Sequence, residues 1–446
     1  MKLFEPGSKA SEGAATYQSL YGVMYPGSYT GAKDEFLAGR DSAWLGVCLC
    51  CTPIYVVSGA DAAKVFNHCC VNKDFSLMKE GMSKHALICN EAGHLVADGV
   101  VMKEAGTSYR SYWLAPVLQY YVEKAISEGQ DVKGAYVRDE FLFQIDGPVS
   151  LEVIEEAAQA DFHDLAFGRH KSGVIAGKDV MVHRLGMSGA LAYEVHGSID
   201  DGEEVYDKLW EILEAKGGRR QGIGNYGVVN HTVAGYANQY QHYNYPYFEG
   251  NPELGTYMAQ CWCTFEGFGS AGDDQTAFNV YPGEVGWGYL INFDHDFVGR
   301  DALLKVRRNP PRKMVTLEWN ADDVADVFAS QFRGTDQECY DEIQGHNDDK
   351  MVGFKTLVRG DKVLNEKGDV IGIATGRTNA YFERRMVSLA MVLPEYAEEG
   401  RELIVLWGEV GHQQKEIRVR VAQFPYYQGE WRNETFDVEK IPHPSF

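Results

Sequence analysis

The sequence predicts an α+β protein in which a mixed region of helices and strands precedes a smaller all-β region. A chain of 446 residues is long enough for two or three hydrophobic cores. Helical and strand patterns are mixed up to about residue 305, whereas short β runs divided by turn residues dominate the rest. The basic, proline-containing stretch 307–312 separates the two regions. We therefore expect one domain over 1–305 and a second, a small β-barrel or jelly roll, over 306–446.

The first region opens with a segment, 15–45, that is expected to contain a helix. After it, apolar runs bounded by glycine or polar turn residues predict strands, and apolar residues three and four apart predict helices. The strands are expected at 54–57, 85–89, 94–102, 141–145 and 180–185, and the helices at 61–66, 114–128, 151–160 and 203–214. A hairpin turn is expected at 90–93, and Ser150 is a candidate helix cap.

The second region is expected to consist of strands. The β runs lie at 314–319, 351–358, 362–364, 370–374, 387–392, 402–406 and 416–421. Their short length and closely spaced turns are typical of a barrel. The acidic tract 322–349 interrupts this pattern and is expected to form a surface excursion.

The charge balance argues against two classes of partner. The formal net charge is −22 at pH 7, whereas nucleic acids and anionic membranes both attract positively charged surfaces. No apolar stretch is long enough for a membrane-spanning helix, and the N-terminus lacks the apolar core of a signal peptide. We therefore expect a cytoplasmic protein that acts on a small molecule.

The nine cysteines predict neither a disulfide framework nor a metal centre. Cys48 and Cys51 form one Cys-x-x-Cys, but no second pair of that spacing follows. Most of these thiols are expected to be reduced and buried, and no metal is expected.

Two motifs carry the functional signal. The segment 185–197, Leu-Gly-Met-Ser-Gly-Ala-Leu-Ala-Tyr-Glu-Val-His-Gly, joins a glycine-punctuated turn to a strand with one carboxylate, Glu194. The segment 296–303 reads Asp-Phe-Val-Gly-Arg-Asp-Ala-Leu. Together they resemble the aminomethyltransferase family, which includes the T-protein of the glycine-cleavage system. The resemblance implies a folate-binding, T-protein-like fold of several subdomains, one-carbon transfer, and tetrahydrofolate as the cofactor.

Further segments carry the same resemblance in the same order along the chain. They are Gly59-Ala60-Asp61-Ala62, Asn90-Glu91-Ala92-Gly93, Gln144-Ile145-Asp146-Gly147-Pro148, Pro282-Gly283-Glu284-Val285-Gly286, Val370-Ile371-Gly372-Ile373-Ala374-Thr375-Gly376 and Val387-Ser388-Leu389-Ala390. No single segment is decisive, but their order and spacing together are specific.

The departures from the family pattern concern the substrate. Ala97 replaces the first member of an acidic pair, so that only Asp98 remains. The segment 48–52, Cys-Leu-Cys-Cys-Thr, stands where the glycine-cleavage enzymes have an Asp-Val-Ser-His-Met-like sequence, and 222–231 lacks their arginines and acids. The sequence is more similar to the tetrahydrofolate-dependent O-demethylases of methoxylated aromatic acids such as vanillate and syringate.

The reaction implied by this resemblance moves a methyl group from an aryl ether to N5 of tetrahydrofolate and gives 5-methyltetrahydrofolate and a phenol. Folate N5 is the nucleophile, so the protein must place the reactants in line and stabilise the departing phenolate. A tyrosine or histidine can donate the required proton. The segment 236–249 is unusually aromatic. The candidate catalytic residues are Tyr247, which is preferred, then Tyr245, His242 and His231. Alternatively, these rings only line an apolar wall.

Glu194 leads the candidate cofactor-binding residues, because its carboxylate can accept paired N–H donors from the pterin ring. Asp98 is second and could bind near N5 or N10 of folate, or cap its own hairpin. The remaining candidates, which could pair with a carboxylate or stack on a ring, are Arg184, Arg110, Tyr193, Tyr226 and Trp262.

Two other interpretations remain open. An N- or S-methyl donor such as a betaine, dimethylglycine or a sulfonium propionate would also suit an aromatic cage, through cation–π attraction. A non-catalytic folate-binding protein is the third interpretation, although the Lys-Gly-Cys-Tyr motif of the iron–sulfur-maturation relatives is absent. The sequence leaves the methyl donor and the oligomeric state open.

Overall fold

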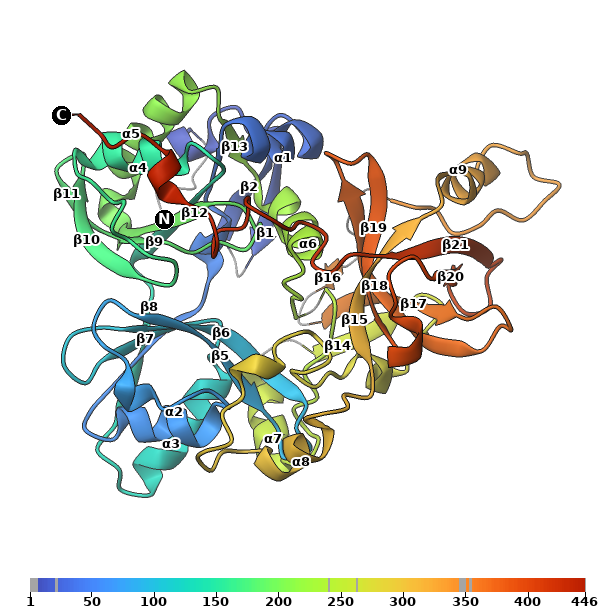
Figure 1. Cartoon of the computed structure of the whole chain (residues 1–446), viewed down its shortest axis with the longest axis horizontal. Coiled ribbons are helices and arrows are strands. Elements are labelled where there is room, and N and C mark those ends of the chain that lie inside the picture. Colours follow the sequence, from blue (N-terminus) through green and yellow to red (C-terminus); the bar gives the residue numbers. More distant parts are fainter. Residues whose placement is uncertain are drawn as a thin grey trace.

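The computed structural model describes residues 7–20, 23–239, 241–261, 264–344, 350–352 and 355–445. Within these residues the chain forms three lobes, each built on its own sheet (Figure 1). None of the described helices is long and apolar enough to cross a membrane.

The first lobe is a six-stranded sheet with helices packed against it. In spatial order its strands are β10 (His170–Ile175), β11 (Lys178–His183), β12 (Ala192–Ser198), β9 (Glu140–Asp146), β3 (Trp44–Gly46) and β13 (Arg219–Gln221). Only the last pair is parallel. The helices that contact the sheet are α1 (Ala32–Asp41), α4 (Ser150–Ala158) and α5 (Gly202–Ala215). In α5, Val205, Leu209 and Ile212 repeat at helical spacing and are buried in the core of this lobe.

The second lobe is an antiparallel five-stranded sheet. Its strands are β5 (Ser83–Cys89), β6 (Leu95–Lys103), β7 (Tyr109–Tyr112), β4 (Ile54–Ser58) and β8 (Lys133–Val137). The helices α2 (Ala62–Cys69), α3 (Val117–Ser127) and α7 (Pro252–Cys261) contribute buried residues to its core. Gly99 is required in β6, because a Cβ there would lie 2.0 Å from the carbonyl oxygen of Tyr112.

The third lobe is a closed β-barrel. Its sheet runs β14 (Thr264–Phe268), β17 (Lys355–Leu364), β18 (Val370–Ala380), β19 (Arg385–Val392), β15 (Lys313–Trp319), β21 (Lys415–Ala422) and β20 (Glu402–Trp407), and β16 (Lys350–Val352) pairs with β17. Pairing of β17 with β20 closes the ring. The acidic helix α9 (Ala321–Ser330), capped by Asn320, projects from the barrel (Figure 1).

One helix joins the first lobe to the barrel. The helix α6 (Ile223–Ala234) contacts β2 of the hairpin β1 (Thr16–Leu20) and β2 (Val23–Ser28), and on its other side it contacts β18 and β19. Nearly all of its side chains are buried. Gly235 ends the helix in a left-handed conformation, with φ 69°. The short helix α8 (Arg300–Val306) precedes the barrel.

The predicted α+β class with a C-terminal barrel is confirmed, and two local expectations are wrong. The segment 15–45 contains the expected helix, α1, which follows the hairpin of β1 and β2. The sequence predicts two separate strands at 351–358 and 362–364, but most of these residues form the single strand β17. Ser150 is not a cap: it is the first residue of α4, and its hydroxyl donates to the carbonyl of Leu191. The strand β14 lies before residue 306 but pairs with β17, so the barrel sheet includes a strand from the first predicted domain. The domain boundary at residue 305 stays a prediction.

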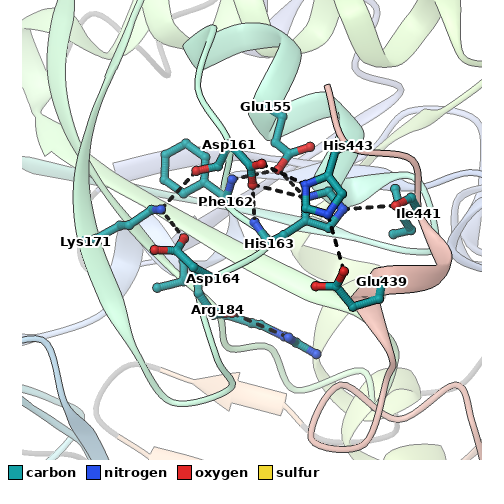
Figure 2. A network of polar contacts seen from close by, with 11 residues as sticks. Glu155, Asp161, Phe162, His163, Asp164, Lys171, Arg184, Glu439, Ile441 and His443 are labelled. Carbon is teal, nitrogen blue, oxygen red and sulfur yellow. Dashed lines mark hydrogen bonds and ion pairs between the residues drawn. The ribbon is translucent and has the colours of Figure 1, made fainter. Parts of the chain in front are cut away.

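The segment 433–443 returns from the barrel to the first lobe (Figure 1), and its residues Ile441 and His443 lie beside His163 (Figure 2). The guanidinium of Arg184 donates to the carbonyls of Asn433 and Phe436, at 2.9 Å each. The ring of His163 lies 2.9 Å from Glu155 through Nδ1 and 3.1 Å from the carbonyl of Ile441 through Nε2. Both partners are acceptors, so both ring nitrogens must donate, and this His163 is an imidazolium.

Replacing His163 with alanine is expected to destabilise the protein by about 3 kcal/mol at pH 6, because it leaves the buried carboxylate of Glu155 without its cation. Burial lowers the pKa of His163, but the carbonyl of Ile441 and the carboxylate of Glu155 outweigh it, and the net pKa is raised. The stabilisation is therefore complete below the ordinary pKa of about 6.5 and fades as the pH rises through the raised value. Urea unfolding at pH 6 and pH 9 measures both effects. Equal stability of wild type and variant at pH 6 would contradict the assignment.

Candidate active site

Glu194 lies in the middle of the six-stranded sheet, on β12. It pairs in register with His183 on β11 and with Gln144 on β9, so the three side chains share one face. The neighbouring Tyr193 points to the opposite face and is fully buried in the core of the first lobe. The alternation of β12 therefore separates a core face from a polar face that carries Glu194.

The carboxylate of Glu194 is held through one of its two oxygens. Its Oε2 accepts a hydrogen bond from Nδ1 of His183 at 3.1 Å, and Nε2 of His196 lies 3.4 Å from the same oxygen. No donor from the described residues reaches Oε1. Burial raises the pKa of Glu194, but the hydrogen bonds and charges of the two histidines outweigh it and lower the pKa to about 2. Glu194 is therefore ionised at neutral pH.

His196 connects Glu194 to a row of alternating charges. Its Nδ1 lies 3.1 Å from the hydroxyl of Tyr112 and 3.4 Å from Oε1 of Glu140. Glu140 in turn accepts from Arg110 at 2.5 Å, and Arg110 also pairs with Glu104 at 2.7 Å. The row crosses from the first lobe, at β12 and β9, to the second lobe, at β7.

A second polar row on the same sheet fixes Gln144. The hydroxyl of Tyr226 donates to Oε1 of Gln144 at 3.0 Å, and Nε2 of Gln144 donates to Asp146 at 3.0 Å. Ser188 also donates to Asp146. Burial raises the pKa of Asp146 to about 7, because these hydrogen bonds offset only part of the desolvation.

Asp98 gathers three donors from the second lobe and the segment that follows α6. The hydroxyls of Tyr243 and Tyr245 donate to its Oδ1 at 2.6 and 2.5 Å, and Nε2 of His85 lies 3.1 Å from Oδ2. Burial raises the pKa of Asp98, but His85 and the two tyrosines outweigh it, and the net pKa is lowered. Asp98 is therefore a second ionised carboxylate. The backbone N–H of Asp98 also donates to the hydroxyl of Tyr245, at 2.8 Å.

The helix α6 brings residues between the two carboxylates. The rings of Tyr226 and His231 meet edge to face, with centroids 6.0 Å apart. Burial raises the pKa of Tyr226, and the charge of Glu194 raises it further. Burial lowers the pKa of His231, and the charge of Asp98 opposes this. Both carboxylates therefore act electrostatically on the Tyr226–His231 edge of α6.

The four candidate catalytic residues occupy different surroundings. Tyr245 is bound to Asp98, and the half-buried ring of Tyr247 lies 5.9 Å from that of Tyr245. His231 donates through Nδ1 to the carbonyl of Tyr236 and accepts from Asn238 through Nε2. His242 is fully buried and accepts from the N–H of Asn238 through Nδ1, so its Nε2 donates to Thr232. Burial lowers its pKa to about 3, and its contacts join the end of α6 to the barrel.

Of the other candidate cofactor-binding residues, some lie beside Glu194 and others do not. Tyr226 lies beside Glu194, whereas Tyr193 lies in the core behind it. Arg184 is engaged by the segment 433–436, and Arg110 is engaged by Glu104 and Glu140. Trp262 lies outside the described residues. The structure thus brings Tyr226 to Glu194 and does not bring Tyr193 or Arg184 to the same face.

The sequence analysis missed several residues that complete the two carboxylate clusters. They are Ser83, His85, Tyr112, Glu140, Gln144, His183, His196 and Tyr243. Only His196 had a local signal, because residues two apart on a strand share a face, as Glu194 and His196 do. The other partners depend on strand register and on contacts between lobes.

Two groups of described residues have ligand atoms close enough together to hold a metal ion. They are His183, Glu194 and His196 at the candidate site, and Asp161, His163 and His443 at the returning C-terminal segment. Cys48 and Cys51 belong to neither group. Of the eight described free cysteines, four are buried, Cys50 and Cys51 are partly buried, and Cys261 and Cys339 are exposed.

Comparison with known proteins gives consistent results over most of the chain. The family model of the GCVT N-terminal domain matches residues 8–237. A sesamin methylene transferase of Sinomonas sp. (strain No.22) is 41% identical, over 98% of this chain and 97% of that protein. A syringate O-demethylase of Sphingobium sp. (strain NBRC 103272 / SYK-6) is 26% identical, over 91% and 94% respectively.

The fold matches a solved structure with much lower sequence identity. The crystal structure of glycine cleavage system aminomethyltransferase T from Bartonella henselae covers 94% of this chain, with a TM-score of 0.68 and 16% identity. The match also covers 96% of that protein, so the two proteins share the same fold along nearly their whole length.

Proposed function

The chain belongs to the aminomethyltransferase family that contains the GCVT N-terminal domain, and from this premise we propose that it moves a one-carbon group from an ether oxygen of a small aromatic compound to tetrahydrofolate. The observation that carries the proposal is the 41% identity to a sesamin methylene transferase along the whole chain, beside the likeness to a syringate O-demethylase. One relative is named for methylene transfer with sesamin and the other for O-demethylation of syringate. The protein is a transferase; its aryl ether substrate is the proposal.

The residues at Glu194 fit the proposed cofactor. A pterin ring presents adjacent N–H donors, and an ionised carboxylate accepts such a pair in a charge-assisted, geometrically selective arrangement. Glu194 is ionised, lies on the polar face of β12, and keeps Oε1 clear of donors from the described residues. Tyr226 and Gln144 flank it with a fixed hydrogen bond. Tetrahydrofolate, when bound, would supply the nucleophilic nitrogen.

In the proposed reaction the folate nitrogen loses a proton, whereas the departing phenolate oxygen gains one. Asp98 is ionised beside three donors, and its negative charge would stabilise positive charge that develops on the folate nitrogen. The departing phenolate needs a donor. Tyr245 commits its hydroxyl proton to Asp98. The proposed donor is Tyr247, whose half-buried ring lies 5.9 Å from that of Tyr245. His242 donates to Thr232 and is left out of the proposed proton path.

The transferred group has two candidates. A methyl group, the one proposed from the sequence, would give 5-methyltetrahydrofolate and a phenol. The higher identity to a relative named methylene transferase favours a second candidate, a methylene bridge between two aryl oxygens. An N- or S-methyl donor is the remaining alternative. The small-molecule partner and the cytoplasmic location stay predictions.

Anaerobic incubation with tetrahydrofolate and a panel of donors tests the proposed function. The panel contains vanillate, syringate, a simple methoxybenzene, a methylenedioxybenzene, glycine betaine, dimethylglycine and dimethylsulfoniopropionate. We expect one aryl ether to give a phenolic product together with a folate heavier by one carbon, and the mass of the folate distinguishes methyl from methylene. Turnover with the betaine, amine or sulfonium donors alone would refute the aryl ether assignment, and a failure to bind folate would refute the cofactor.

A further inference from the structure

We propose that His183 and His196 are positioning residues of the folate site: they hold Oε2 of Glu194 from one side and thereby present Oε1 to the pterin. This inference rests on the proposed function, because it assumes that Glu194 binds tetrahydrofolate. It concerns two histidines that do not themselves need to touch the cofactor.

The first observation is the asymmetry of the Glu194 carboxylate. Both histidines approach the same oxygen, Oε2, at 3.1 and 3.4 Å, and no described residue donates to Oε1. A carboxylate on a flexible side chain turns about its last bond unless one oxygen is fixed. The hydrogen bond from His183 and the ion-pair contact of His196 restrict this rotation before a ligand arrives, which lowers the cost of ordering the site on binding.

The second observation is that each histidine is itself held by a group on another element. Nε2 of His183 lies 2.9 Å from the hydroxyl of Ser83 on β5, so the imidazole donates through Nδ1 and accepts through Nε2. Nδ1 of His196 faces Tyr112 on β7 and Glu140 on β9. Because Ser83 and Tyr112 belong to the second lobe, the orientation of Glu194 depends on how the two lobes meet.

The third observation is the charge state of the two rings. His196 lies between the carboxylates of Glu194 and Glu140, and both of its nitrogens face acceptors, which favours the imidazolium. Burial lowers its pKa, but the two carboxylates outweigh it and raise the net pKa. Burial lowers the pKa of His183, so this ring is neutral. The glutamate therefore has one cationic partner and one neutral partner.

The pH dependence follows from the groups around His196. They are Glu194, Glu140, Tyr112, His183, His170 and, through Glu140, Arg110. The two glutamates favour the protonated ring, and burial opposes it. Loss of the proton at high pH removes the positive charge that His196 places 3.4 Å from Oε2 and weakens the positioning contact. Folate affinity should therefore fall as the pH rises through the raised pKa of His196.

The test measures the Kd of tetrahydrofolate anaerobically between pH 6.5 and 9 for wild type, His196→Gln, Glu140→Gln and Glu194→Ala. In the wild type we expect the Kd to rise about tenfold across this range, because the positive charge beside Oε2 is lost. His196→Gln keeps a donor that does not titrate, so its Kd should be nearly constant. Glu140→Gln removes one carboxylate from His196 and should move the loss of affinity to lower pH.

The outcomes separate this inference from the proposed function. If Glu194→Ala loses folate affinity while His196→Gln and Glu140→Gln both follow the wild-type pH curve, the positioning role is refuted and the folate site stands. If Glu194→Ala binds folate as the wild type does, the folate site itself is refuted. Stoichiometric Co²⁺ binding that competes with folate and is lost in His196→Gln would identify a metal site instead and overturn the proposal.

Discussion

Replacing Glu194 with alanine is expected to weaken tetrahydrofolate binding on the order of 100-fold, because two charge-assisted hydrogen bonds of about 1.5 kcal/mol each are lost. The effect should appear mainly in binding and less in the rate of the bound complex, since Glu194 is proposed to hold the pterin and not the reacting atoms. Isothermal titration under anaerobic conditions measures it directly.

Two control variants sharpen this prediction. Glu194→Gln keeps the shape of the side chain but replaces a charged acceptor with an amide, so it should recover only part of the affinity. Glu204→Ala removes an exposed carboxylate from α5 in the same lobe and should bind folate like the wild type. A normal Kd for Glu194→Ala, with the fold intact by circular dichroism, would remove Glu194 from the cofactor site.

Replacing Tyr247 with phenylalanine is expected to lower kcat by about 100-fold or more while KM changes little, because a general acid acts only as charge develops on the departing oxygen. The ring itself is retained, so its packing against Tyr245 and the two neighbouring hydrophobic clusters should persist. Steady-state kinetics with the donor identified in the panel give both constants.

A matched variant on the adjacent ring tests whether the effect is specific. Tyr245→Phe removes a hydrogen bond to Asp98 and should perturb that carboxylate. A donor with a more acidic phenol as leaving group should rescue Tyr247→Phe but not Tyr245→Phe, since a better leaving group needs less protonation. If Tyr247→Phe raises KM and leaves kcat unchanged, Tyr247 is a wall of the binding site and not the proton donor.

Sequence patterns predicted the fold well where local and tertiary preferences agree. The helix α5 and the hairpin of β5 and β6 follow from the spacing of apolar residues and from the turn at 90–93. The hairpin of the opening segment was not predicted, because β1 is exposed along most of its length and carries no clear strand alternation. The strand β17 exceeds both predicted runs because it pairs with several strands of the closed barrel, a tertiary effect.

The sequence predicted part of the candidate site: the carboxylates of Glu194 and Asp98, and the tyrosines Tyr226 and Tyr245 beside them. Glu194 and Asp98 stand in motifs, and both are ionised in the structure, where Glu194 is buried and Asp98 is partly buried. Their partners arrive from other strands and another lobe: Ser83 reaches His183, and Tyr243 reaches Asp98. Such pairings depend on register and on lobe contacts, which no local pattern encodes. For the same reason Tyr193 belongs to the motif but faces the core.

The returning C-terminal segment bears on the order in which the protein is made. Val438 and Ile441 are part of the core of the first lobe, with Phe436 packed against it, and Arg184 is held by carbonyls of the same segment. The ribosome supplies these side chains only after the whole barrel has been synthesised. The lobe that carries Glu194 therefore stays incomplete throughout elongation, and a fragment that ends before the barrel would expose the apolar surface that these residues cover.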